Sequence, residues 1–115
     1  MELPRVADLT AGEWLEHARF PGIFMKNLLT AVDNPFSNVN VVRVPSGGII
    51  GRHRHVQQFE TVWVIRGNTI LTLDQTEVHL NVGQIIAIPI GLEHALRNAG
   101  DSPVELLTFF TPPLA

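Results

Sequence analysis

Three histidines and one glutamate, His53, His55, Glu60 and His94, form a set of side chains that could bind a metal ion. Alternate residues of a β-strand point to the same side, so His53 and His55 can lie together if they share a strand. Glu60 follows after a short bend, and His94 has to be brought across from another strand. Three imidazoles and one carboxylate suit Mn, Fe, Co, Ni, Cu or Zn. Such a set would leave two positions of an octahedron free for water, substrate or dioxygen.

The strands and turns that must position these side chains are visible in the rest of the sequence. Short apolar runs recur along the chain, and nearly every gap between them carries Gly, Pro, Asn or Asp. The runs predict strands over residues 23–29, 39–44, 61–65, 69–73, 78–80, 84–88, 94–96 and 104–110. Short strands separated by turns indicate an all-β sandwich or barrel. Near the N-terminus, Thr10-Ala11-Gly12-Glu13 matches a capping box and predicts a short helical turn.

The composition limits the classes of protein to which the chain can belong. Its 115 residues match one domain, and 45% apolar with 17% charged residues favours a folded globule. A net charge of −3 with scattered basic residues excludes a nucleic-acid footprint and a polybasic membrane patch. No apolar run is long enough to cross a bilayer, and the N-terminus lacks the pattern of a secretion signal. With no cysteine in the chain, a cytoplasmic location is expected.

The spacing of the four side chains is part of a longer pattern. The first block is Gly47-x5-His53-x-His55-x4-Glu60-x6-Gly67, and the second is Gly83-x5-Pro89-x-Gly91-x2-His94-x3-Asn98. All ten fixed positions of these blocks match the two motifs of the cupin family, which the chain therefore resembles. The motifs cover residues 47–98, close to half of the chain, and only fifteen residues separate Gly67 from Gly83. The resemblance is to a minimal, single-domain cupin spanning residues 1–115.

The resemblance implies a fold and a ligand set. The fold is a double-stranded β-helix, a small jelly-roll barrel closed from two facing sheets. His53, His55, Glu60 and His94 are implied to bind one divalent transition metal per chain. The glycines and the proline of the motifs are implied to form turns, and Asn98 to close the turn that follows His94.

Strand alternation predicts which side chains face the metal. Parity with His53 and His55 leaves Arg52 and Arg54 outside and turns Ile50 or Gly51 towards the cavity mouth. Parity with His94 turns Leu96 inward, and Glu93, next to His94, is expected to point outward. Related small cupins suggest that Leu106 and Thr108 also face the barrel, with Gln58 and Asn40 as further polar contacts. The inward face of 39–44 stays open, because both of its faces carry apolar residues. The predicted substrate pocket is Ile50, Gln58, Leu96, Leu106 and Thr108, whereas His17 and His79 are interpreted as surface residues.

Three functions fit these features. The first is a metal-dependent oxidoreductase of the dioxygenase type acting on a small organic molecule, with Glu60 as ligand and proton acceptor. It is favoured by the apolar pocket and by the absence of tyrosine, which disfavours lyases and epimerases that use a tyrosine acid. The second is a non-catalytic module that binds a small molecule or a metal. The third, an isomerase or decarboxylase, would need a charged pocket with Arg43 or Glu93 inside. Apolar residues on both strand faces, among them Phe59 and Trp63, predict a homodimer.

Overall fold

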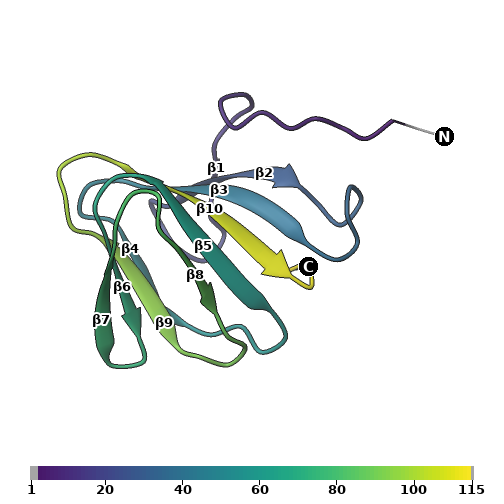
Figure 1. Cartoon of the computed structure of the whole chain (residues 1–115). Coiled ribbons are helices and arrows are strands. Elements are labelled where there is room, and N and C mark those ends of the chain that lie inside the picture. Colours follow the sequence, from purple (N-terminus) through teal and green to yellow (C-terminus); the bar gives the residue numbers. More distant parts are fainter. Residues whose placement is uncertain (1–2, 115) are drawn as a thin grey trace.

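Two antiparallel β-sheets face each other in the computed structural model, which describes residues 3–114 (Figure 1). The larger sheet has the order β1 (Leu15–Glu16), β2 (Phe24–Leu29), β3 (Asn38–Val44), β10 (Val104–Thr111), β5 (Phe59–Arg66) and β8 (Ile85–Ile88). The smaller sheet has the order β4 (Ile49–His53), β9 (His94–Asn98), β6 (Thr69–Leu73) and β7 (Thr76–Leu80). The chain passes repeatedly between the sheets, and the all-β jelly-roll architecture is confirmed.

Strand alternation places the core between the sheets. Along β10, buried and half-buried residues alternate from Val104 to Phe110, so Leu106 and Thr108 face inward as expected. The face of β3 that the pattern left open is settled by its pairing: Asn40 lies opposite Thr108, and Val42 opposite Leu106. These β3 residues therefore face the barrel. The buried cluster unites residues from both sheets, including Val44, Val62, Val64, Leu71, Leu80, Ile88 and Leu96.

The helical turn predicted at residues 10–13 is wrong, because no helix occurs among residues 3–114. The Asp8 carboxylate accepts hydrogen bonds from the backbone N–H of Thr10 at 2.8 Å and from its hydroxyl at 2.7 Å. The Thr10 hydroxyl is thus a donor to the preceding residues, whereas a capping box requires it to accept from the residues that follow. Gly12 then adopts a positive φ of 84°, which no right-handed helix accommodates. Accordingly, no helix in the described part of the chain could span a membrane.

Candidate metal centre

The four side chains of the expected ligand set come together at one end of the barrel. His53 is the last residue of β4 and His94 the first of β9, and these two residues pair across the smaller sheet. Glu60 enters from β5 of the facing sheet, and His55 lies in the bend between β4 and β5. One ligand atom from each residue lies within 4.8 Å of the others. Residues up to 41 positions apart in the sequence thereby form one compact nitrogen–oxygen cluster.

The turn that precedes β9 helps to position both His94 and His55. The positive φ of Gly91, 83°, allows the tight turn that follows Pro89, and the Leu92 N–H donates to the Pro89 carbonyl at 3.3 Å. The Gly91 N–H also donates to the His55 carbonyl at 2.8 Å. This hydrogen bond ties the turn before His94 directly to the bend that carries His55. The glycine of the second block therefore positions a ligand of the first.

Backbone carbonyls orient two of the rings. His53 Nδ1 donates to the Gly51 carbonyl at 2.8 Å, and His94 Nδ1 donates to the Leu92 carbonyl at 2.9 Å. Because a carbonyl oxygen can only accept, the proton must be on Nδ1, and Nε2 is left with the lone pair that binds metals. Burial lowers the pKa of His53, which favours this neutral form.

Glu60 concentrates negative charge among the rings. Its Oε1 lies 3.1 Å from His94 Nε2 and 3.4 Å from His55 Nε2, and the carboxylate is 12% exposed. Burial would raise the pKa of Glu60, but its contacts with His55 and His94 outweigh this effect and hold the pKa at about 2. Burial would likewise lower the pKa of His94, but its bonds to Glu60 and to the Leu92 carbonyl raise it. The group attracts a positive charge, either a proton on His94 or a metal ion.

The donor atoms fit a metal ion. Bonds of about 2.1 Å to nitrogen and oxygen put neighbouring ligand atoms of an octahedron about 3.0 Å apart and opposite ones about 4.2 Å apart. The separations of Glu60 Oε1 from His94 Nε2 and His55 Nε2, 3.1 and 3.4 Å, are close to the shorter of these values. His55 Nε2 is also buried without a hydrogen-bond partner, which is costly for a polar atom unless something else binds it. The cluster could hold a metal ion.

The cluster opens into a cavity of about 250 Å³ between the two sheets. Four of the five predicted pocket residues line it, namely Ile50, Leu96, Leu106 and Thr108. Gln58 does not line the cavity, because its amide turns away and donates to the Pro113 carbonyl at 3.4 Å. Apolar side chains, among them Val42, Val62, Leu71, Ile88 and Phe110, supply most of the remaining wall.

Comparison with known families identifies this combination of barrel and cluster. The family described as "Cupin domain" matches residues 40–110, more than half of the chain. The chain belongs to the cupin family. Both motif blocks lie inside the matched range, so the resemblance seen in the sequence is confirmed.

Relatives of this cupin have diverse names. Polyketide synthase CurC from Streptomyces cyaneus is 32% identical, over 97% of this chain and 71% of its own length. Mannose-1-phosphate guanylyltransferase from Klebsiella pneumoniae is 34% identical over 66% of this chain, but the chain spans only 16% of that protein. A structure of a "predicted oxalate decarboxylase" from Thermotoga maritima superposes with a TM-score of 0.84 at 19% identity, covering 94% of this chain and 99% of the other. At that identity the likeness concerns the fold alone.

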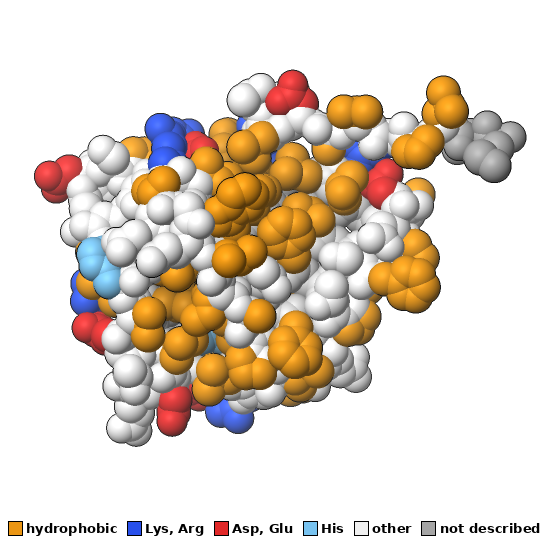
Figure 2. All heavy atoms as spheres, viewed as in Figure 1, with side chains coloured by type: hydrophobic (Ala, Val, Ile, Leu, Met, Phe, Trp, Pro, Cys, Tyr) orange, Lys and Arg blue, Asp and Glu red, His pale blue; other side chains and the backbone are white. Residues whose placement is uncertain are grey.

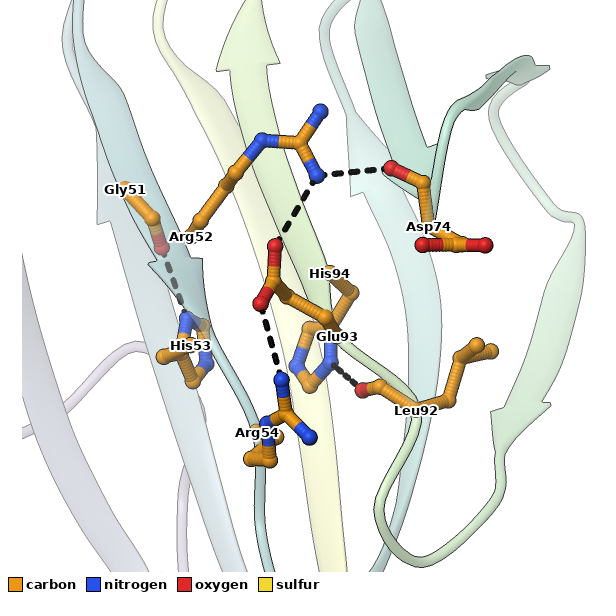
Figure 3. Close-up of polar contacts among 8 residues, drawn as sticks. All are labelled: Gly51, Arg52, His53, Arg54, Asp74, Leu92, Glu93 and His94. Carbon is orange, nitrogen blue, oxygen red and sulfur yellow. Dashed lines mark hydrogen bonds and ion pairs between the residues drawn. The ribbon is translucent and has the colours of Figure 1, made fainter.

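An ion-pair cluster on the outer surface of the cupin connects the ligand-bearing elements (Figure 3). Glu93 accepts from Arg52 at 3.1 Å and from Arg54 at 3.0 Å, and Arg52 also donates to the Asp74 carbonyl at 2.6 Å. The arginines flank His53, and Glu93 precedes His94, so all three point outward as strand parity predicted. The cluster joins the two strands beside the metal centre from the solvent side.

Two charged or titratable residues at the cavity were missed by the sequence analysis. His17, predicted to be a surface residue, lines the cavity together with Arg19 and Phe20. No motif marks this segment; it turns back at Gly22, whose φ is 77°, before β2 begins. His79, in contrast, is exposed as expected. The other residue that could have charged the pocket, Arg43, lies over the Trp14 ring at 5.6 Å and does not line the cavity.

Proposed function

We propose that this cupin is a metal-dependent oxidoreductase of the dioxygenase type, acting on a small organic molecule. The observation that carries the proposal is the location of the three-histidine, one-glutamate cluster in the wall of a largely apolar cavity. Glu60 is the only carboxylate among the described residues that line this cavity. A substrate there meets the metal ligands and apolar walls rather than a second acid.

The side chains of the site would have two roles, metal binding and proton transfer. His53, His55, Glu60 and His94 would hold the metal, which when bound orients substrate and oxygen and stabilises developing negative charge. The apolar walls exclude water from the reacting groups. Glu60 Oε2 makes no hydrogen bond with the described residues, so this oxygen is free to accept a proton from the substrate.

The likeness to polyketide synthase CurC over almost the whole chain favours a class of substrates. We propose polyketide-like compounds that carry phenol or β-dicarbonyl groups. Both groups have acidic protons and oxygen atoms that bind transition metals, and both are attached to apolar frameworks that match the cavity wall. Catechols, flavonols and diketones are therefore the first compounds to test.

Metal content and oxygen uptake test the proposal together. Tag-free protein is purified without chelator, analysed by inductively coupled plasma mass spectrometry, and reconstituted with Mn, Fe, Co, Ni, Cu or Zn. We expect near one equivalent of bound metal and oxygen uptake with at least one compound. His53→Ala should lose the metal and all uptake while its circular dichroism spectrum is unchanged, and His79→Ala is the matched control. Full metal occupancy in His53→Ala would refute the site assignment.

The main alternative is a non-catalytic binding module. It predicts tight binding of one of these compounds without oxygen uptake for any of the six metals. An isomerase or decarboxylase acting on a polar acid is the third candidate: neither Arg43 nor Glu93 lines the cavity, and Arg19 is the only Lys or Arg that does so among the described residues.

We also propose a homodimer formed through the outer face of the larger sheet. Phe59, Trp63 and Ile85 on β5 and β8 are 43%, 41% and 60% exposed. Figure 2 shows hydrophobic side chains gathered over the region of β5, β8 and β10. Contiguous apolar surface of this kind commonly marks an interface. Light scattering should give twice the chain mass of 12.7 kDa, and a value near 12.7 kDa would contradict the dimer.

A further inference from the structure

His17 presents one unused hydrogen-bond donor at the cavity. Its Nδ1 accepts from the backbone N–H of Arg19 at 3.0 Å and of Phe20 at 3.3 Å. An accepting Nδ1 carries no proton, so the neutral ring has its proton on Nε2. Nε2 makes no hydrogen bond with the described residues, although the ring lines the cavity. Burial and the nearby Arg19 charge lower the pKa of His17, which favours this neutral, donating form.

Arg19 presents an unpaired positive charge beside it. Its guanidinium lies 5.3 Å from the centre of the Phe20 ring, and Phe20 in turn lies 5.1 Å from the His53 ring. Arg5, Arg66 and Arg97 all have a carboxylate partner, whereas Arg19 has none among residues 3–114. Arg19 therefore stacks on Phe20, and Phe20 in turn lies against the ring of the metal ligand His53, so the exposed Arg19 cation is close to the metal centre.

The two groups differ in chemistry from the rest of the cavity. A guanidinium and a neutral histidine N–H can only donate, and the guanidinium adds a positive charge. Val42, Leu96 and Leu106, which also line the cavity, offer apolar contact only, and Asn40 and Thr108 add neutral polar atoms. An occupant that satisfies both regions needs an apolar body and an acceptor group, best an anionic oxygen, at the end next to Arg19.

We propose that His17 and Arg19 form an anion-recognition site at the cavity, selecting substrates with an acidic oxygen on an apolar framework. The acidic oxygen belongs to a carboxylate or to an ionised phenol or enol. This proposal rests on the proposed function in taking the same cavity as the substrate site, and it narrows the substrate class. His17 and Arg19 determine specificity by binding the substrate; the chemical step stays with the metal centre.

A pair of matched probes tests the proposal. Binding of 2-naphthoate and of uncharged 2-naphthylmethanol to metal-loaded protein is measured by isothermal titration calorimetry. His17→Asn keeps an oxygen near the position of Nδ1 for the two backbone donors but removes the Nε2–H. Arg19→Gln removes the charge, and Arg97→Gln, which removes an equal charge on the outer surface, is the control.

We expect wild-type protein and Arg97→Gln to prefer the anionic probe. His17→Asn and Arg19→Gln should each reduce this preference by about fivefold or more, with the affinity for the neutral probe unchanged. A preference for the anionic probe that is caused by the metal itself should persist in all variants. The test is therefore the part of this preference that is lost in His17→Asn and in Arg19→Gln. An undiminished preference in both variants, or no binding of 2-naphthoate at millimolar concentration, would overturn the proposal.

Two separate readouts keep this result apart from the proposed function. Oxygen uptake without any preference for the anionic probe would refute the recognition site and leave the oxidoreductase intact. A preference that depends on His17 and Arg19, without oxygen uptake for any metal, would support the site and refute the oxidoreductase.

Discussion

Replacing Glu60 by glutamine is the most informative single change, because it keeps the side-chain size, removes the charge and turns one acceptor oxygen into an NH2 donor. The pKa of Glu60 falls from 4.5 to about 2, and each pH unit corresponds to about 1.4 kcal/mol, so the ionised carboxylate is stabilised by about 3 kcal/mol. Glutamine can still accept one hydrogen bond from His94, which recovers part of this energy. We therefore expect Glu60→Gln to lower the free energy of unfolding of the metal-free protein by about 2 kcal/mol.

The sign of the two pKa shifts sets the pH at which to measure. The lowered pKa of Glu60 contributes stability above pH 4.5 that is lost as the pH falls towards 2. The raised pKa of His94 contributes stability below pH 6.5 that is lost as the pH rises through its folded value. Both contributions are present between pH 4.5 and 6.5. The difference between wild type and variant should thus be largest near pH 5.5 and smaller at pH 8.5.

The assay is urea unfolding of chelator-treated protein, followed by circular dichroism, with and without added metal. At a metal concentration about 100 times its dissociation constant, wild type should gain about 2.7 kcal/mol, whereas Glu60→Gln should gain far less. Glu77→Gln is the control, because it removes a carboxylate from an exposed pair with Arg97 and should cost under about 0.5 kcal/mol. The reasoning is refuted if Glu60→Gln has the same free energy of unfolding as wild type at pH 5.5, or if added metal stabilises the variant as much as it stabilises wild type.

Three further predictions concern positions that support the site. Gly67→Ala should cost about 3 kcal/mol or more in urea unfolding, because its φ is 96° and a Cβ there would lie 2.7 Å from Val104 Cα. Gly83→Ala, with similar φ and open space, should cost about 1 kcal/mol; equal losses would contradict the steric argument. Asn98→Ala should cost about 2 kcal/mol and lower the melting temperature, since the amide makes three hydrogen bonds, and an unchanged melting temperature would count against this role. Glu93→Gln should weaken metal binding less than about tenfold in a competition titration, because its ion pairs are partly exposed; complete metal loss would disprove that limit.

The sequence predicted the elements of this protein that depend on local alternation. A strand presents every second residue to one side, so the inward position of Leu96 and the outward position of Glu93 followed once the strands were placed. Alternation also put Leu106 and Thr108 on one face of their strand, and the resemblance to small cupins indicated that this face is the inward one. Turn residues marked the strand ends, and Asn98 does close the next turn, accepting from the Gly100 N–H at 2.9 Å.

Predictions failed for side chains outside the strands that form hydrogen bonds with partners the sequence pattern does not indicate. Gln58 lies in the bend before β5, where the two-residue period of a strand does not apply. Its amide donates to the Pro113 carbonyl, 55 residues away in the sequence. The predicted capping box does not form for the same reason, because the Thr10 hydroxyl donates to the Asp8 carboxylate. Neither partner can be identified from spacing alone.

The sequence by itself determined the cupin fold, the cluster of three histidines and one glutamate, and the parity of the strands around it, because these follow from motif spacing and strand periodicity. Only the tertiary structure decided that Asn40 and Val42, rather than Val41 and Arg43, face the cavity, because both faces of β3 are apolar and the choice depends on pairing with β10. It alone also brought His17 and Arg19 to the cavity. Their position results from packing between segments distant in the sequence, which no local pattern records.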